Sequence, residues 1–432
     1  MQSSGVVIVF HCVPFSVDPK IEQFWGRLRL RLKKSSYELV LITTTEILDK
    51  TIPHIEVPYI WPLDGCFYNS DEIIGPDANT VLTLSTWYGL KKNDAVSTWK
   101  KAHSYFSELL SQLEPAAVIS WQSTNPISRI VRQLCLSQGI PWMTSERGWT
   151  INTLMFDLNE NNYHTELTNS LILNEVYRSY KVNLVLLEKH RRYTKELENV
   201  ERYLVHEEPN HKKHRWGIPD DSTIFALFTH GEPHVQALAG ERNFQQNHGL
   251  TPGQLQEYVE ILSSYLAKNN SYLLIKEHPF NLINGHCLDI KDLPNVFMVT
   301  DTINDILNSV DYCLFTLSTL QFDIALKFNT PFGLLSRGIL SDINAAPYIG
   351  DFDDVAQFIN EFTNPKLWNP RKLQIDRKIS FLIEFVLLNI DDNSMDISIE
   401  KLALHLEKFK GNTQDIIQDS HSYAEVIKIN KD

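Results

Sequence analysis

The sequence predicts an α/β protein built from two Rossmann-like, doubly wound domains that face a cleft. Short apolar strands alternate with amphipathic helices in two separate series along the 432 residues. Such alternation is typical of parallel sheets covered by helices on both faces. A chain of this length is also expected to form more than one hydrophobic core. Hydrophobic residues make up 43% and charged residues 22%, which suits a globular interior rather than disorder.

The first series occupies residues 1–206, the predicted N-terminal domain. It opens with the strand Val6–Phe10, a helical pattern over 21–34 and the strand Leu39–Ile42. Further segments follow in the same alternation: a helix over 98–113, a strand over 116–121, a helix over 126–137 and a strand over 140–143. Because doubly wound sheets bind ligands at the carboxyl ends of their strands, we expect functional residues just after strands.

The second series follows a polar linker at 207–222 and forms a C-terminal domain over 223–410. Its predicted strands are 223–229, 272–275, 296–299, 312–315 and 332–335, and a helix is predicted over 253–268. Helical patterns at 353–362, 379–388 and 397–409 close this domain, and 411–432 is a polar tail.

Charge and cysteine content exclude several function classes. The formal net charge of −13 repels a phosphate backbone, so no nucleic-acid partner is expected. The five cysteines form no CxxC pair, so we expect neither a zinc cluster nor a disulfide framework. No apolar run reaches the roughly 20 residues that span a bilayer, and Val6–Phe10 lacks the flanks of a signal peptide. We expect a cytoplasmic protein that meets a membrane only at its inner face.

Lys276, His278 and Pro279 come directly after the apolar strand over 272–275. Lysine and histidine can pair with the phosphate of a leaving group, and proline fixes the turn beside it. The alternative is a satisfied loop histidine beside a solvated pair of Lys276 and Glu277. The three residues are candidates for nucleotide binding.

Ser318 and Thr319 follow the strand over 312–315 and precede a helical segment. Hydroxyls and unpaired N–H groups at a helix N-terminus form an anion site, although an ordinary N-cap also explains Ser318. Asp323, one turn into the helix, can accept hydrogen bonds from a ribose, and a helix-start carboxylate is the alternative. These residues are further candidates for nucleotide binding.

Glu146 follows a buried strand and is flanked by Trp142 and Trp149. Desolvation by such neighbours raises the pKa of a carboxyl group, as a general acid or base at neutral pH requires. The alternative is a surface region, Glu146–Arg147, without catalytic meaning. Glu146 is therefore a candidate catalytic residue, and Gly148 and Trp149 are candidate contacts to the acceptor or sugar.

His230, Glu232 and His234 follow the first strand of the second series. Metal binding is discounted because no third ligand group stands at a recognisable spacing. Recognition of a phosphate or carboxylate, or a catalytic role for Glu232 and His230, is preferred. His234 is a candidate contact to the acceptor or sugar.

Three motifs resemble, in order and spacing, those of bacterial capsule-polysaccharide transferases that use CMP-activated sugars, notably the Kdo transferases. They are Glu146-x-Gly148, Lys276-x-His278-Pro279, and Ser318-Thr319 followed by Asp323. The resemblance spans about residues 115–335 and implies the two-Rossmann glycosyltransferase B fold with an acceptor-side N-terminal domain. It implies that His278, Pro279, Ser318 and Thr319 contact CMP, that Lys276 lies near the phosphate, and that Glu146 is a general acid or base.

The sequence departs from that family pattern at His230 to His234, where a glutamine followed by an aspartate is expected. If the reaction uses a carboxylate nucleophile from this loop, Glu232 is the local candidate. Gln321 also stands where the family commonly has glycine.

The resemblance implies transfer of Kdo or a related acidic sugar from a CMP donor to a surface-polysaccharide or glycolipid acceptor. The implied partners are a nucleotide-sugar and a glycan or lipid-linked acceptor at the membrane face, with no metal cofactor. Two alternatives are a transferase of sialic acid, a furanose or a phosphosugar, and a non-catalytic nucleotide- or sugar-binding subunit. Several aromatic residues offer flat faces to an acceptor, with core packing as the alternative for each: Trp61, Trp87, Tyr88, Trp121 and Trp149.

Overall fold

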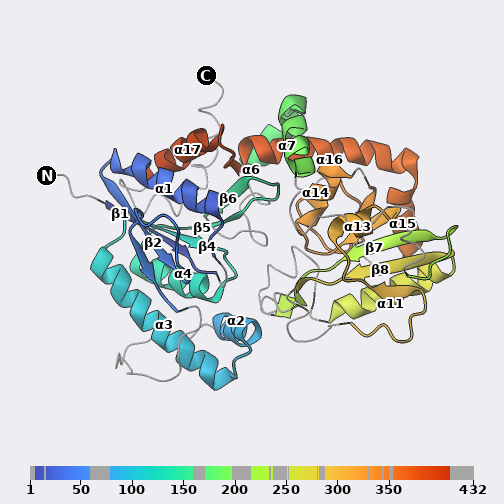
Figure 1. The fold of residues 1–432 in the computed structure, drawn as a ribbon, viewed down its shortest axis with the longest axis horizontal. Coiled ribbons are helices and arrows are strands. Elements are labelled where there is room, and N and C mark those ends of the chain that lie inside the picture. The colour runs from blue at the N-terminus through green and yellow to red at the C-terminus, as the bar shows by residue number, and fades with distance from the viewer. Residues whose placement is uncertain are drawn as a thin grey trace. The chain divides into compact units, whose positions relative to one another are not determined.

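A computed structural model describes residues 5–13, 16–58, 78–158, 171–196, 216–232, 235–236, 251, 253–279, 281, 288–328, 330–341, 345–349 and 354–408. The chain divides into two units, each with its own sheet (Figure 1). Unit 1 comprises Met1–Gly148, Asn152–Arg178 and Phe385–Asp432, and unit 2 comprises Trp149–Ile151 and Ser179–Glu384. Both sheets are mainly parallel and carry helices, which confirms the predicted α/β fold with two Rossmann-like domains.

In the described part of unit 1, seven strands form one sheet in the order β12-β6-β5-β4-β1-β2-β3. They are β1 (Gly5–His11), β2 (Tyr37–Thr43), β3 (His54–Glu56), β4 (Ala117–Trp121), β5 (Trp142–Arg147), β6 (Thr153–Asp157) and β12 (Leu388–Asn389). The strands β1 to β5 pair in parallel, whereas β6 is antiparallel to both β5 and β12. Because β5 continues through Arg147, Glu146 lies within a strand, and the predicted strand end at 143 is wrong.

Alternate residues of β1 pack against different helices, because successive side chains of a strand point to opposite faces. Val7 and Val9 share a core with α1 (Pro19–Lys33) and α17 (Met395–Lys408). Ile8 and Phe10 share a core with α2 (Ala78–Tyr88), α3 (Lys92–Leu113) and α4 (Pro126–Gln138). The sheet of unit 1 is therefore covered on both faces, with α17 beside α1 (Figure 1).

In the described part of unit 2, five strands pair in parallel in the order β11-β10-β7-β8-β9. They are β7 (Thr223–Phe228), β8 (Ser271–Lys276), β9 (Val296–Met298), β10 (Tyr312–Phe315) and β11 (Phe332–Leu334). Its helices are α7 (Leu184–Glu196), α11 (Gln254–Ala267), α13 (Ile303–Leu307), α14 (Leu320–Lys327), α15 (Val355–Thr363) and α16 (Pro365–Phe385), whereas α6 (Leu171–Ser179) lies in unit 1 except for its last residue. Among the described helices, none is long and apolar enough to cross a membrane.

The units divide the chain differently from the predicted linker at 207–222. The long segment of unit 2 begins at Ser179, and α17, which the sequence assigned to the second domain, belongs to unit 1. Its apolar residues Leu402 and Leu406 pack in the core that contains α1. The Arg31 guanidinium bonds Glu400 at 2.5 Å and Glu407 at 2.8 Å. The periodicity of an amphipathic helix predicts that one side is buried, but not which sheet buries it. The predicted tail at 411–432 lies outside the described residues.

Leu406→Ala should lower the free energy of unfolding by about 2–5 kcal/mol, because it removes buried contacts and leaves a cavity. Leu406 is 1% exposed, whereas Leu404 on the same helix is 39% exposed. The control Leu404→Ala should therefore change the free energy by less than about 0.5 kcal/mol. Urea unfolding followed by tryptophan fluorescence measures both. Equal effects of the two variants would contradict the packing of α17 on α1.

Candidate functional site

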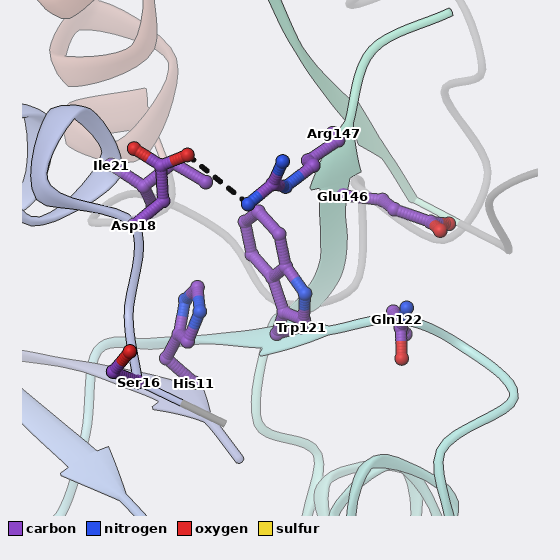
Figure 2. Close-up of a pocket in the computed structure, with 8 residues that line it drawn as sticks. All are labelled: His11, Ser16, Asp18, Ile21, Trp121, Gln122, Glu146 and Arg147. Atoms are coloured by element: carbon purple, nitrogen blue, oxygen red, sulfur yellow. Dashed lines mark hydrogen bonds and ion pairs between the residues drawn. The ribbon is translucent and has the colours of Figure 1, made fainter. Parts of the chain in front are cut away.

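A cavity of about 280 Å³ lies at the carboxyl ends of β1, β4 and β5 in unit 1. The strands β1 and β4 are neighbours in the sheet. The chain runs from β1 to β2 on one side of this pair and from β4 to β5 on the other side. Such a switch point is where open α/β sheets bind ligands. The lining consists of His11, Ser16, Asp18, Ile21, Trp121, Gln122, Glu146 and Arg147 (Figure 2). The predicted residue Glu146 therefore lies at a cavity formed by unit 1 itself.

Glu146 and Arg147 reach this cavity from opposite faces of β5, because they are consecutive residues of one strand. Figure 2 shows Arg147 turned towards Asp18 above the Trp121 ring, and Glu146 turned the other way. The Arg147 guanidinium lies 3.1 Å from the Asp18 carboxylate. Asp18 also caps α1 by accepting a hydrogen bond from the Lys20 amide at 2.9 Å. One side of the cavity thus holds an ion pair, and the other holds Glu146.

His11, which the sequence analysis missed, ends β1 on the same side as the ion pair. The Trp25 indole N–H donates to His11 Nδ1 at 3.4 Å, and the His11 ring lies 4.1 Å from that of Trp121. Burial, aided by the charge of Arg147, lowers the pKa of His11 to about 3. Since an indole nitrogen only donates, the neutral ring carries its proton on Nε2. The available signal was a polar residue at the end of the apolar run Val6–Phe10.

Asn125 holds together the two strand ends on which the cavity is built. Its buried side chain donates to the Cys12 carbonyl at 2.8 Å and accepts from the Ile127 amide at 2.9 Å. The same residue therefore caps α4 and links the end of β1 to the loop after β4. In that loop Gln122 has a φ of 61°, and its amide donates to the Ser145 carbonyl at 2.8 Å. A non-glycine residue in this region is uncommon and is held by its surroundings.

In unit 2, the predicted residues after β7, β8 and β10 lie at adjacent strand ends. The Thr229 hydroxyl accepts a hydrogen bond from the His278 amide at 2.9 Å. The His230 amide donates to the Thr316 hydroxyl at 2.6 Å. These bonds connect the three loops directly, so the structure brings together His230, His278 and the segment that contains Ser318.

Glu232 is buried and hydrogen-bonded within unit 2. One carboxylate oxygen lies 3.0 Å from His230 Nε2, and the other accepts from the Gly253 amide at 2.7 Å. The Glu232 amide donates to Asn281 at 2.7 Å, and the residue is 7% exposed. These contacts suit Glu232 to orienting His230 and do not suit it to acting as a nucleophile. The predicted contact His234 lies outside the described residues. Among the residues that the structure describes, no group of three or more His, Cys, Asp or Glu side chains is placed to hold a metal ion.

His278 and Lys276 differ in the charge that they can offer a phosphate. Burial, with a smaller effect of His230, lowers the pKa of His278 to about 4, so its ring is neutral at pH 7. Burial also lowers the pKa of Lys276, which the nearby Asp301 opposes. The Lys276 ammonium donates one proton to the Asp301 carbonyl at 2.7 Å. We therefore expect His278 to act as a hydrogen-bonding group rather than as a cation, beside the exposed Pro279.

Ser318 and Thr319 form the start of α14. The Ser318 hydroxyl, one residue before the N-cap position, accepts a hydrogen bond from the Leu320 amide at 3.3 Å. Thr319 occupies the N-cap position, is exposed, and makes no capping bond through its side chain. Asp323 lies in the first turn of the helix. The Thr319 hydroxyl and the first amides of α14 together are suited to an anion.

Gly148 and Trp149 have structural roles in the connection between β5 and β6. The Gly148 amide donates to the Thr153 carbonyl at 2.8 Å, and an added Cβ would lie 2.8 Å from the Thr153 Cβ. Only glycine fits that approach. Trp149 is 4% exposed and stacks on Phe322 of α14 at 5.7 Å within unit 2. The position of Trp149 therefore agrees with core packing, the alternative to the predicted sugar contact. Trp121 is also buried, with 3% of its surface exposed.

Comparisons with known proteins give distant structural likenesses. No protein-family model matches the chain, and no curated protein matches it. A glycosyltransferase from Rickettsia africae is 12% identical, with 95% of this chain and 100% of that chain covered and a TM-score of 0.40. A UDP-GlcNAc 2-epimerase from Methanocaldococcus jannaschii is 11% identical, with coverages of 83% and 93% and a TM-score of 0.40. The N-terminal domain of Candida albicans trehalose-6-phosphate phosphatase is 10% identical, with coverages of 94% and 97% and a TM-score of 0.44. At these values none of them assigns a substrate to this chain.

The free energy of unfolding should fall as the pH is lowered from about 6.5 towards 4. In that range the unfolded chain protonates His11 and His278, whereas the folded chain keeps them neutral because their pKa values are about 3 and about 4. Each histidine contributes a loss of up to about 1.4 kcal/mol per pH unit. His278→Asn should flatten the curve, as measured by urea unfolding at pH 7.5 and pH 5. Parallel curves for wild type and variant would contradict the burial of a neutral His278.

Proposed function

We propose that the chain transfers a sugar from a nucleotide-activated donor to a hydroxyl group of a glycan or glycolipid. The bond between the anomeric carbon and the phosphate oxygen breaks, and the leaving nucleotide keeps the electron pair. The acceptor oxygen bonds to the anomeric carbon, and its proton passes to a base. Unit 2 supplies the nucleotide site, and Glu146 of unit 1 is the proposed acid–base group.

The observation that carries this proposal is the junction of three strand ends in unit 2. The hydroxyls of Thr229 and Thr316 fix the loops after β7, β8 and β10 against one another. Lys276 and the N-terminus of α14 supply positive potential, and His278 and Thr319 supply hydrogen bonds. A phosphate group needs no metal ion in such a setting, so activity should persist in EDTA.

A CMP donor carrying Kdo or a related acidic sugar is our preferred choice. Its support is the order of the motifs around Glu146, His278 and Ser318, which resembles that of the Kdo transferases. Sialic acid, a furanose or a phosphosugar is the alternative donor unit, and product mass distinguishes these. A glycolipid acceptor would bring the chain to the inner face of a membrane.

Calorimetric titration with CMP, UDP and GDP tests the donor site. CMP should bind most tightly, and His278→Ala and Thr319→Ala should each weaken it about tenfold, since each removes a hydrogen bond to a charged ligand. His103→Phe, on α3 of unit 1, is the control and should leave nucleotide binding unchanged. A preference for UDP or GDP would exclude the CMP assignment, and no binding of any nucleotide would exclude the proposed function.

Glu146→Gln should lower kcat about 100-fold or more while nucleotide affinity stays unchanged, because the amide cannot transfer the proton. The control Glu56→Gln removes an exposed carboxylate from β3 of the same unit and should leave kcat unchanged. Initial rates of sugar transfer measure both variants. An unaltered kcat in Glu146→Gln would move the acid–base role to another residue, and nucleotide binding without turnover in the wild type would favour the non-catalytic subunit.

A further inference from the structure

His230 and Glu232 form a buried, hydrogen-bonded pair just after β7 in unit 2. His230 is 3% exposed and Glu232 is 7% exposed. His230 Nε2 lies 3.0 Å from one carboxyl oxygen of Glu232, and the Gly253 amide donates to the other at 2.7 Å. A hydrogen bond between Nε2 and a carboxyl oxygen needs one proton between the two atoms. The pair therefore holds at least one proton.

The other ring nitrogen of His230, Nδ1, is the place for a second proton. It is buried and has no hydrogen-bond partner in the part of the chain that the structure describes. No internal hydrogen bond therefore fixes whether Nδ1 carries a lone pair or a proton. With one proton the pair has a net charge of −1, and with two protons it has none. The net charge can thus change at Nδ1 while the bond to Glu232 stays in place.

The backbone around this pair is held by three further hydrogen bonds. The His230 amide donates to the Thr316 hydroxyl at 2.6 Å, and its carbonyl accepts from the Asn281 side chain at 3.0 Å. The Glu232 amide donates to the same Asn281 side chain at 2.7 Å. The two residues are therefore fixed against the neighbouring loops. A charge that arrives nearby can be met by a change in protonation without a movement of the backbone.

The His278 ring lies close enough to His230 for their charges to interact. Burial and, to a smaller extent, His230 lower the pKa of His278 to about 4. His278 therefore stays neutral at pH 8 and takes up no proton there. Thr229 and Thr316, which join the same loops through their hydroxyls, carry no ionisable group. Glu232 and His278 are thus the ionisable side chains that the described residues place against His230.

We propose that the His230–Glu232 pair gains a proton at Nδ1 when a nucleotide phosphate binds beside Lys276 and the start of α14. This inference rests on the proposed function, which puts a nucleotide at this junction. A proton from the solvent bonds to the Nδ1 lone pair, so the net charge of the pair rises from −1 to 0. Repulsion between the pair and the phosphate is thereby removed.

The same change would favour the leaving nucleotide over the intact donor. When the bond between the anomeric carbon and the phosphate oxygen breaks, the phosphate gains one negative charge. A pair that takes up a proton at that point stabilises the products of bond cleavage more than the bound donor, as catalysis requires. The proton returns to the solvent when the nucleotide leaves.

Calorimetric titration of the full chain with CMP at pH 8 counts the protons. The titration is run in two buffers that differ in their enthalpy of ionisation, neither of them phosphate. The wild type should take up about one proton per CMP. CMP itself contributes little, because a phosphate monoester has a second pKa of about 6. Since binding takes up a proton, the Kd should rise by up to about tenfold from pH 7 to pH 8.

Two variants assign the proton to the pair. His230→Gln keeps an amide that can reach Glu232 but cannot take up a proton, so the uptake should be lost. Glu232→Gln can donate to Nε2, which leaves the proton of a neutral ring on Nδ1 before CMP binds, so the uptake should again be lost. The control His103→Phe replaces a histidine that stacks on Trp99 in unit 1 and should keep the full uptake. Urea unfolding checks that each variant is folded.

Two results would overturn the inference. One is CMP binding by the wild type without proton uptake, which needs no variant to be seen and leaves the donor site in place. The other is uptake that persists in His230→Gln, which would assign the proton to Lys276, since burial lowers the pKa of that residue. If uptake occurs as described but no sugar is transferred, the proposed function fails and this inference stands. If CMP, UDP and GDP all fail to bind, both fail.

Discussion

Each candidate site depends on the pairing of two neighbouring parallel strands. After each pair, the chain continues to strands on opposite sides of the sheet. In unit 1, Phe10 pairs with Ser120, and the next residues, His11 and Trp121, are brought ring against ring. In unit 2, Phe228 pairs with Phe315, which brings the loop of His230 to the Thr316 hydroxyl. Backbone hydrogen bonds between strands thus set which side chains meet, and single polar side chains fix the loops beyond. Asn125 does so in unit 1 and Thr229 in unit 2.

The two sites differ in the charged side chains that they contain and in the contacts of those side chains. In unit 2, the carboxyl group of Glu232 is hydrogen-bonded to His230 and to the Gly253 amide. The positive potential there comes from Lys276 and from the start of α14, which suits an anionic ligand. In unit 1, the Arg147 guanidinium lies 3.1 Å from the Asp18 carboxylate, and Glu146 lines the same cavity from the other face of β5.

Much of the fold could be predicted from the period of the apolar residues. Val6–Phe10 and Tyr272–Ile275 read as buried strands because they are short and almost wholly apolar, and the structure contains both. The partner of α17 could not be predicted, because Arg31 and the glutamates that bind it are far apart in sequence. Likewise, the convergence of His230 and His278 follows from strand order, whereas the role of Glu232 depends on Gly253, which no motif links to it.

Residue types alone also could not predict the environment of single side chains. Trp149 looked suited to a sugar face, but its ring is covered by Phe322. His11 was overlooked since it belongs to no motif, and its character depends on Trp25 from the following helix. Burial and tautomer depend on neighbours in three dimensions, so residue types identify candidate residues but not their exposure or protonation.

The division of the chain has a consequence for how the protein is made. The chain passes between the units after Gly148, Ile151, Arg178 and Glu384, so neither unit is one continuous segment. Unit 1 takes its last strand and α17 from beyond Phe385. During synthesis the sheet that begins at Gly5 therefore lacks one of the two helices on one face until α17 (Met395–Lys408) has left the ribosome. The apolar side chains of α1 that pack against α17 stay exposed to water through that interval.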